Sequence, residues 1–461
     1  MSINKYIIRS TFVGALGGLL FGFDTAVISG ATTGITRAFG LGNLHVLIPI
    51  IHQTMTVSEL GITVSIALWG TVIGALTAGS LGQRYGSREM LRVTAVLYVV
   101  SSIGCAFAPT WWLLLVARFV GGLGIGGSSV LGPVYIAEMA PPRLRGRLVG
   151  TFQINIVVGI LLAYLSNYLI GLMNVGSAEW RWDLGIAALP AVVFFGLLFG
   201  IPRSARWLVT KSRFEEAREV LELLDTPNSE AELADILESL HMERSQQNAA
   251  LFQRLGGRLR YGKPIFLAIT IGAFNQLSGI NAILYYLNDI FAAAGFDRIS
   301  SNLQAVAIGA MNLVATLLGM ALIDRVGRKL LLMIGAIGTA ICLACVSAIF
   351  FTHKHQALLV WALVAYIAFF AISQGAVIWV YISEIFPTRV RSKGQSLGSG
   401  THWIMNALLS FAFPVIALRS GSYPFIFFAA MMVVQFFVVL FFFPETKQIS
   451  LEDLQRKLKI V

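Results

Sequence analysis

The chain has 461 residues, of which 56% are hydrophobic and 12% are charged. Soluble globular proteins carry about 25% charged residues, so this composition, with a mean hydropathy of +0.76, excludes an ordinary soluble protein and indicates an all-α polytopic membrane protein. The net charge of +11 does not indicate nucleic-acid binding, because the basic residues stand in short loops between apolar segments and form no basic face.

A helix that crosses a bilayer needs about 20 apolar residues. Twelve segments meet this condition: 11–31, 58–82, 90–108, 111–137, 147–172, 183–201, 264–287, 303–323, 330–351, 357–383, 394–418 and 422–443. We expect their limits to hold within about four residues.

The basic residues predict the orientation. Arg118 lies within span four, and few of the other Lys and Arg residues fall in loops on the side opposite the termini. Those few are Arg37, Arg181, Arg298, Lys354 and Arg419. Since Lys and Arg concentrate in cytoplasmic loops, we expect both termini in the cytoplasm.

Two loop motifs of the first spans recur in the same order after the later spans. The pairs are Arg84-Tyr-Gly-Ser-Arg88 with Arg325-Val-Gly-Arg-Lys329, and Glu138-Met-Ala-Pro-Pro142 with Glu384-Ile-Phe-Pro-Thr388. This repeat predicts duplication of a six-helix unit. The expected parts are a first half 1–201, a cytoplasmic linker of short amphipathic helices 202–263, a second half 264–443 and a cytoplasmic tail 444–461. Parallel halves around a central site are a transporter architecture.

Two charged residues stand in the middle of apolar spans, Asp24 in span one and Arg118 in span four, with Glu59 at the edge of span two. Ionisable groups at membrane depth cost a few kcal/mol, and these two are in the same half, so they can pair directly. A salt bridge that only fixes helix register is one interpretation. The other is proton coupling, because burial disfavours the charged carboxylate while a nearby arginine favours it.

Amide side chains in the apolar spans also need a reason, since a buried amide is costly unless it is hydrogen-bonded. They are Gln153, Asn275, Gln276, Asn281 and Asn312. Any one of them can be explained by hydrogen bonds between helices. Three of the five crowd one short stretch of span seven, which favours a site for a neutral ligand rich in hydroxyls.

No catalytic or metal-binding pattern accompanies these features. The six His residues have no metal-ligand spacing, Cys342-Leu-Ala-Cys345 lies within span nine, and the glycine-rich run 121–127 lies inside span four without a preceding strand. We interpret the glycines as positions of close helix packing. We expect no enzymatic activity, no cofactor and no metal.

Several motifs together resemble the sugar porter family of the major facilitator superfamily over the whole chain. They are Gly22-Phe-Asp-Thr-Ala-Val-Ile-Ser-Gly30, Ala117-Arg-Phe-Val-Gly-Gly-Leu-Gly-Ile-Gly126, Gln276-Leu-Ser-Gly-Ile-Asn281, Ser383-Glu-Ile-Phe-Pro387 and Pro444-Glu-Thr-Lys447. The resemblance implies the major facilitator fold and transport of a sugar. It also implies that Asp24 and Arg118 couple transport to protons, as the matching residues do in proton-coupled members.

The same resemblance assigns sugar contacts to Gln153, Gln276, Asn281, Asn312 and Trp379. Asn275 stands where many members have Gln, and His402 stands where they have Gln or Asn. Ile160 is similar to the apolar choice of hexose carriers, which favours a hexose while a pentose stays possible. Tyr285 matches a tyrosine that closes the outer side of the site, although plain packing also explains it.

Acidic and basic residues of the repeated loops are candidates for a cytoplasmic gate. They are Arg84, Glu138, Arg145, Arg325, Glu384 and Arg391. Contacts among them can hold the inner side shut, while the alternative is that they only signal topology.

We therefore expect a monomeric transporter that moves a monosaccharide with a proton across a lipid bilayer, with a bacterial inner membrane favoured as the plasma membrane that holds it. The first alternative is a proton-independent uniporter of the same fold. A non-transporting sugar sensor is a remote alternative, because sensors of this family carry long cytoplasmic tails and only 18 residues follow the last predicted span.

Overall fold

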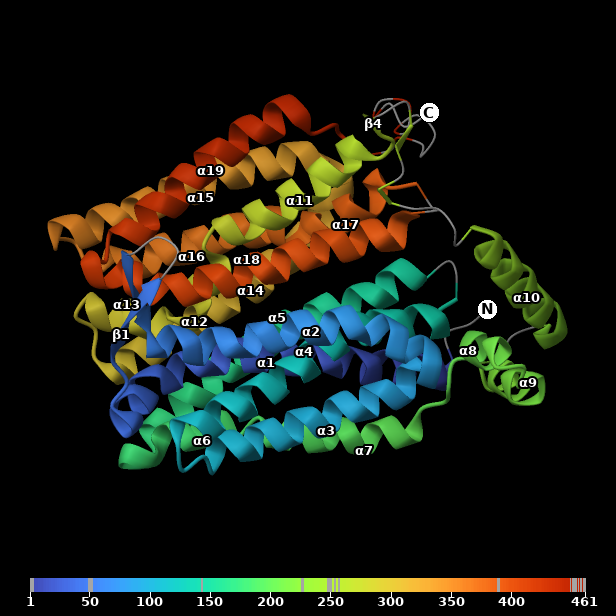
Figure 1. The fold of residues 1–461 in the computed structure, drawn as a ribbon, viewed down its shortest axis with the longest axis horizontal. Helices are drawn as coiled ribbons and strands as arrows, with labels where there is room; N and C mark the ends of the chain where they lie inside the picture. The colour runs from blue at the N-terminus through green and yellow to red at the C-terminus, as the bar shows by residue number, and fades with distance from the viewer. Residues whose placement is uncertain are drawn as a thin grey trace. The chain divides into compact units, whose positions relative to one another are not determined.

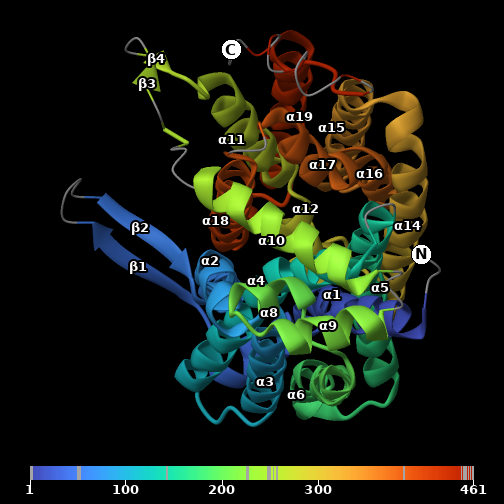
Figure 2. The ribbon, with the colours of Figure 1, turned by 90° about the vertical axis from the view of Figure 1, so that its right-hand side faces the viewer.

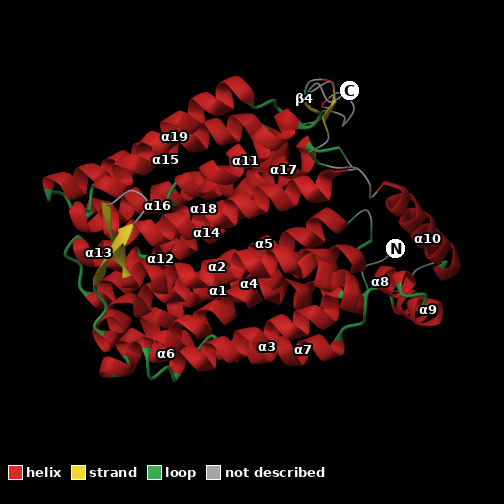
Figure 3. Cartoon of the chain, viewed as in Figure 1, coloured by secondary structure: helices red, strands yellow, loops and turns green. Residues whose placement is uncertain are grey.

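The computed structural model describes residues 4–48, 53–141, 144–224, 228–246, 251–252, 254–255, 258–387, 390–447, 449, 454, 456 and 458. Helices dominate these residues (Figures 1 and 3). The elements of the N-terminal part are α1 (Lys5–Phe39), β1 (Asn43–Ile48), β2 (Gln53–Ser58), α2 (Glu59–Tyr85), α3 (Ser87–Ala106), α4 (Trp111–Met139), α5 (Arg145–Leu172), η1 (Gly176–Ala178), α6 (Glu179–Gly185), α7 (Ala188–Leu197) and η2 (Leu198–Gly200).

The elements of the middle and C-terminal parts follow. They are α8 (Ala205–Thr210), α9 (Phe214–Leu223), α10 (Ser229–Gln246), β3 (Arg254–Leu255), β4 (Arg258–Leu259), α11 (Gly262–Leu277), α12 (Ile280–Tyr285), α13 (Leu287–Ala293), α14 (Arg298–Val326), α15 (Arg328–Thr352), α16 (Leu358–Phe370), η3 (Ala371–Gly375), α17 (Ala376–Ile385), α18 (Arg391–Arg419) and α19 (Tyr423–Phe442).

Twelve helical stretches of the described chain are long and apolar enough to cross a membrane, which confirms the predicted number of spans. The expected accuracy of about four residues was wrong at three of them: span one covers Lys5–Phe39, span six begins at Gly176 and span eight begins at Arg298. Hydropathy detects only the apolar centre of a span, whereas the helical backbone continues into polar flanks. At span eight, for example, the Asp297 side chain accepts a hydrogen bond from the Ser300 N–H and caps the helix.

The linker contains the short helices α8, α9 and α10, as the charge pattern predicts. Helix α9 buries Ala217, Val220 and Leu221 on one face. An antiparallel hairpin of β1 and β2 was not predicted, and it occupies the loop between spans one and two (Figure 2). Its register pairs Asn43 with Ser58.

The chain forms two compact units. Unit 1 comprises Met1–Thr25, Trp69–Ala163 and Leu184–Asn248, and unit 2 comprises Ala26–Leu68, Tyr164–Asp183 and Ala249–Val461. The division of the sequence into 1–201, 202–263, 264–443 and 444–461 stays a prediction.

Small residues let the helices of unit 1 approach closely. A Cβ atom on Gly126 of α4 would lie 2.2 Å from the Thr71 carbonyl oxygen of α2, a distance that real Cβ atoms do not reach. Between α1 and α5, a Cβ on Gly22 would lie 1.8 Å from the Ile156 carbonyl oxygen. Helices in a bilayer associate through such packing, so the glycine-rich run of span four serves helix contact, as interpreted from the sequence.

Unit 2 has an apolar core where α15, α17 and α19 meet. Leu332, Ile382 and Val439 are buried in it, and the rings of Tyr381 and Phe443 stack with their centroids 5.2 Å apart. The core thus draws buried residues from these three spans.

Replacing Gly126 by Ala should lower the thermal midpoint of the purified protein, because the new methyl group meets the backbone of α2. Overpacking of this kind costs about 1–3 kcal/mol. The matched control is Gly79→Ala on α2, where a Cβ meets nothing within 4 Å and the higher helix propensity of Ala is favourable. Equal midpoints for both variants would contradict the packing argument.

Candidate functional site

Asp24 of α1 and Arg118 of α4 form an ion pair inside unit 1. The Arg118 Nη1 atom lies 3.5 Å from Asp24 Oδ2, and the side chains are 4% and 16% exposed, respectively. The Arg118 Nε atom is buried and has no hydrogen-bond partner within the described ranges. The arginine therefore keeps unused donor capacity, and the structure brings together the two residues that the sequence placed within reach of each other.

Two side-chain hydroxyl groups of unit 1, those of Tyr98 and Ser128, are hydrogen-bonded to each other close to α1. The Tyr98 hydroxyl and Ser128 Oγ lie 2.9 Å apart, and Ser128 Oγ also lies 3.4 Å from the Gly17 carbonyl oxygen of α1. These contacts join α3 and α4 to α1.

A second acidic residue of the spans is buried. Asp183 of α6 is 1% exposed, and neither carboxylate oxygen has a partner in the part of the chain that the structure describes. The sequence analysis missed it because the predicted span six began at residue 183, whereas the structure begins this span at Gly176. Asp183 is thus a further ionisable residue buried within a span.

A break in span seven positions its amide side chains in unit 2. Helix α11 ends at Leu277 and α12 begins at Ile280, with Gly279 between them at φ 85°. This left-handed conformation favours glycine, and a Cβ there would lie 2.3 Å from the ring of Phe428. The amides of Gln276 and Asn281 consequently stand on either side of a turn.

These amides form a connected network with the histidine of span eleven. Gln276 Nε2 lies 3.0 Å from Asn275 Oδ1 and 3.2 Å from Nδ1 of His402. Asn281 Nδ2 donates to Gln276 Oε1 at 3.1 Å. Four predicted sugar contacts therefore lie together, and their remaining donors and acceptors can serve a ligand.

Aromatic rings border this network. The ring centroids of Trp379 and His402 lie 5.2 Å apart, and Trp403 meets His402 edge to face at 5.2 Å. Trp379 is partly exposed, while Trp403 is buried. The sequence analysis did not select Trp403, although its place next to His402 was a usable signal.

Tyr285 takes part in a second polar chain. Asn406 Nδ2 donates to the Tyr285 hydroxyl at 3.2 Å, and Ser410 Oγ donates to Asn406 Oδ1 at 3.2 Å. The Tyr286 hydroxyl donates to the Ser410 carbonyl oxygen at 3.0 Å. The sequence analysis also missed Asn406, an amide within an apolar span.

The other predicted contacts lie on different elements. Asn312 is a buried residue of α14 in unit 2. In unit 1, α5 carries the partly buried Gln153 and the buried Ile160.

Glu384 is held by Arg328 and not by the arginines that the sequence analysis selected. Arg328 Nη2 lies 2.8 Å from Glu384 Oε1, its Nε lies 3.2 Å from Oε2, and Thr446 Oγ1 donates to Oε2 at 2.6 Å. Such two-point contact is the geometry in which arginine binds a carboxylate most firmly.

The remaining gate candidates lie at the ends of the spans. Arg84, Arg145 and Arg325 are exposed, and Arg391 is partly buried, with its Nε 3.4 Å from the Phe386 carbonyl oxygen. Glu138 accepts a hydrogen bond from Ser87 Oγ at 3.3 Å. Two further arginines of the repeated loops, Arg143 and Arg389, lie outside the described residues.

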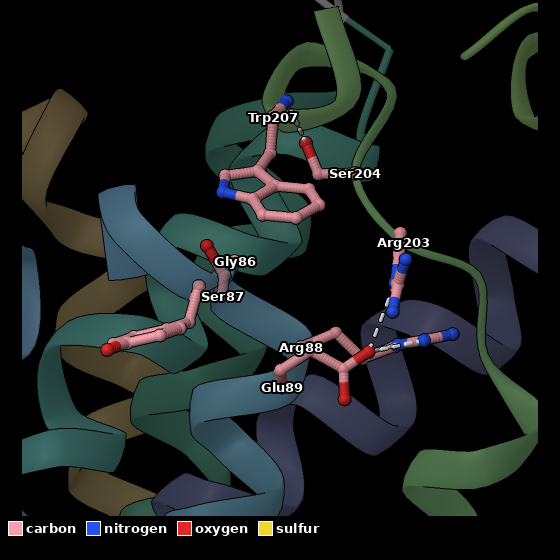
Figure 4. Close-up of a pocket in the computed structure, with 8 residues that line it drawn as sticks. Gly86, Ser87, Arg88, Glu89, Arg203, Ser204 and Trp207 are labelled. Carbon is pink, nitrogen blue, oxygen red and sulfur yellow. Dashed lines mark hydrogen bonds and ion pairs between the residues drawn. The ribbon is translucent and has the colours of Figure 1, made fainter. Parts of the chain in front are cut away.

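A cluster of charged residues in unit 1, formed by Arg88, Glu89 and Arg203, was not predicted from the sequence (Figure 4). Glu89 of α3 pairs with Arg88 at 2.5 Å and with Arg203 Nε at 3.1 Å. The cluster borders a small pocket that is also lined by Ser204 and Trp207. These bonds tie the start of α3 to the segment after span six.

Comparisons with known proteins identify the family to which the chain belongs. Residues 10–458 match the family model described as "Sugar (and other) transporter". The chain is 32% identical over 483 residues to the D-xylose-proton symporter of Escherichia coli, covering 98% of this chain and 96% of the relative. It is 33% identical over 471 residues to the glucose transport protein of Synechocystis, with 98% and 97% covered.

A solved structure gives the same result. The xylose transporter XylE from E. coli, in a partially occluded inward open conformation, superposes with a TM-score of 0.83 at 30% identity and covers 97% of this chain and 100% of that chain. The fold and its twelve spans define a transporter of the major facilitator superfamily and not an enzyme, which confirms the expected class. The chain belongs to the sugar transporter family, and its function is the transport of a sugar across a membrane.

Glu445, which follows the last span, supplies a pH-dependent contact outside the membrane. Its carboxylate accepts hydrogen bonds from the backbone N–H groups of Arg328 and Lys329, each at 3.0 Å. Burial acts to raise the pKa of Glu445, but the bonds from these two N–H groups and from those of Lys447 and Thr446 outweigh burial and hold the pKa below its ordinary value. The charged form therefore ties the tail to the start of α15.

Glu445→Gln should lower the thermal midpoint at pH 7. A lowered pKa contributes stability above the ordinary pKa of about 4.3, and this contribution disappears as the pH falls through the lowered value. The midpoints of wild type and variant should therefore converge only as the pH falls below about 4.3, when Glu445 becomes protonated in the folded protein. Glu222→Gln, at an exposed glutamate of α9, is the control, and a Glu445 difference that did not change with pH would contradict the assignment.

Proposed function

We propose that this protein is a proton-coupled monosaccharide symporter that works by alternating access, with Asp24 and Arg118 as the coupling pair. The observation that carries the proposal is their ion pair, buried where two spans meet, with Arg118 only 4% exposed. An isolated charge at this depth is strongly unfavourable. The two charges therefore stabilise each other as long as the contact lasts.

The coupling follows from the electrostatics of this pair. Arg118 favours the ionised carboxylate, while burial favours the neutral acid. If α1 and α4 separate, Asp24 loses its counter-charge and takes up a proton; when the contact forms again, the proton leaves. Arg118 retains an unpaired Nε donor in this contact, so a modest change of geometry can alter its hold on the carboxylate.

For the sugar we propose a site built on Asn275, Gln276, Asn281 and His402, with Trp379 as its aromatic wall. The connected amides offer both donors and acceptors, which pyranose hydroxyls require. The partly exposed Trp379 ring suits the C–H face of a sugar, and both Trp379 and Trp403 contact the ring of His402. Asn312, Gln153, Ile160 and Tyr285 complete the proposed contacts on grounds of family resemblance.

We favour a hexose over a pentose because Ile160 is apolar. The relatives do not decide between these sugars, since one is named for D-xylose and another for glucose. We further propose a monomer in a plasma membrane, with a bacterial inner membrane favoured and both termini in the cytoplasm, on the basis of the distribution of basic residues.

The charged residues at the ends of the spans fit a cytoplasmic gate. Glu384 already engages Arg328 and Thr446, and Glu138 engages Ser87. We propose that these two acids, with Arg84, Arg145, Arg325 and Arg391, exchange partners when the inner side closes. In this scheme each acid has one set of partners in each conformation.

The decisive experiment is uptake of labelled glucose, galactose and xylose into proteoliposomes, with and without an inward proton gradient. Accumulation of one sugar above equilibrium, only with the gradient, would establish symport and identify the substrate. Saturable uptake that stops at equilibrium would instead identify a uniporter and reduce the ion pair to a structural role. Binding without uptake would favour a sensor.

Asp24→Asn should abolish gradient-driven accumulation and leave sugar exchange between the two sides at least partly intact, because the amide cannot carry the proton but can still fill the site. Counterflow and gradient-driven uptake of the same preparation measure the two properties. Asp235→Asn is the control, since this acid is exposed on α10, outside the spans. Undiminished accumulation by Asp24→Asn would refute the coupling role.

Asn281→Ala should raise the KM for the transported sugar by about tenfold, because loss of one good hydrogen bond costs roughly 1–1.5 kcal/mol and a factor of ten corresponds to about 1.4 kcal/mol. Asn302→Ala is a comparison within unit 2, since its amide binds the Asn167 carbonyl oxygen at 3.2 Å and belongs to a different contact. Equal effects on KM would argue against a sugar contact at Asn281.

A further inference from the structure

Unit 2 contains an acidic residue, Asp289, whose hydrogen bond to Thr32 does not involve the coupling pair. This bond belongs to a group of polar bonds that join the ends of α1, α5 and α6 to the segments from α12 to the start of α14. The members are Thr32 with Asp289 at 3.0 Å, the Tyr164 hydroxyl with the Leu284 carbonyl oxygen at 3.0 Å, Asn302 with the Asn167 carbonyl oxygen at 3.2 Å, and Arg298 with Glu179. By the orientation proposed above, this is the outer side.

Asp289 stands on α13, beyond the end of span seven at Tyr285. Its Oδ1 atom meets the Thr32 hydroxyl of α1 at 3.0 Å. Its Oδ2 atom is buried and has no hydrogen-bond partner among the residues that the structure describes. The residue is thus partly buried, and one of its two carboxylate oxygens is buried without a partner among the described residues.

The Thr32 hydroxyl has one proton and two neighbouring acceptors. Besides Asp289 Oδ1 it faces the Ser29 carbonyl oxygen at 3.2 Å. If Asp289 is ionised, both neighbours compete for the single proton of the hydroxyl. If Asp289 carries a proton, Asp289 donates to Thr32 and Thr32 donates to Ser29, so both contacts become full hydrogen bonds.

The charged groups on the elements around Asp289 do not neutralise it. Arg37, at the end of α1, is exposed. At the start of α14, Arg298 pairs with Glu179 and Asp297 caps its own helix. Of the ionisable groups on the α12 side, the Tyr285 and Tyr286 hydroxyls bond to Asn406 and to the Ser410 carbonyl oxygen.

The energetics agree with this geometry. Burial raises the pKa of Asp289 to about 7, although the Thr32 and Thr33 hydroxyls offset part of the rise. An aspartate in water has a pKa of about 3.9. The neutral form is therefore preferred in the contact and the charged form is preferred in water.

We propose that Asp289 is a second proton-binding site of this transporter, whose neutral carboxyl group donates a hydrogen bond to Thr32 and holds α1 against α13. This site goes beyond the coupling pair, and it does not depend on sugar or on a proton gradient. Binding of the proton stabilises the closed contact, and loss of the proton favours its opening.

The direction of the pH effect follows from linkage. The closed contact has the raised pKa, so the stability that the proton gives is complete below about pH 4 and is lost as the pH rises through about 7. Acid therefore closes the α1–α13 contact and alkali opens it. Asp289→Asn cannot titrate, so its contact should not respond to pH over this range.

The test is a distance measurement between spin labels on Ala38→Cys and Ala293→Cys, two exposed positions at the ends of α1 and α13. Cys105, Cys342 and Cys345 are replaced by Ala, and the full chain is studied in nanodiscs without sugar. Between pH 5 and pH 8 the ratio of short to long distances should fall by at least about tenfold, which corresponds to one unit of pKa difference. In Asp289→Asn this ratio should stay constant.

Three variants make the test specific. Thr32→Val removes the acceptor hydroxyl and should shrink the response, whereas Thr36→Val, whose hydroxyl binds the Thr32 carbonyl oxygen at 2.9 Å, should keep it. Asp297→Asn should also keep the pH response, because Asp297 is exposed and asparagine can cap the helix in its place. Size-exclusion profiles and thermal midpoints show whether each variant is folded.

A pH response that persists in full in Asp289→Asn, or no response in the unsubstituted protein, would overturn the proposal. A response abolished by Asp24→Asn but kept by Asp289→Asn would assign it to the coupling pair and would also overturn the proposal. Failure of gradient-driven sugar accumulation does not affect the measurement, so the two proposals can fail independently.

Discussion

The bilayer's lack of hydrogen-bonding water is the constraint on which the rest of this structure depends. Every polar group within a span needs a partner from the protein, and this explains both the helical architecture and the placement of the polar side chains. Asp24 finds Arg118, and Gln276 finds Asn275, Asn281 and His402. Function in such a protein resides where these partnerships are incomplete or exchangeable.

The polar groups differ in how completely they are satisfied. Glu384 is held by Arg328 and Thr446, which suits a contact that fixes structure in one conformation. Arg118, Asp183 and Asp289 each retain buried atoms without partners among the described residues. Incomplete satisfaction lowers the free-energy difference between alternative arrangements or protonation states, so these groups are suited to respond to protons or to a ligand.

Hydropathy alone predicted the twelve spans, because each needs a long apolar stretch that leaves an unmistakable mark in the sequence. The rarity of charge within these stretches also selected Asp24 and Arg118, and the crowding of amides selected Asn275, Gln276 and Asn281. The same approach misjudged the ends of spans one, six and eight and did not predict the β1–β2 hairpin, because polar flanks and short hairpins carry no such mark.

The sequence by itself thus determined the class of protein, its membrane spans, the family to which it belongs and most candidates for its site. Only the tertiary structure decided which side chains meet: Glu384 with Arg328, Gln276 with His402, and Thr32 with Asp289. Composition and periodicity are properties of single segments, whereas a contact between residues far apart along the chain depends on how helices break, rotate and pack. The αL turn at Gly279 is an example, since it places Gln276 and Asn281 within bonding distance of each other.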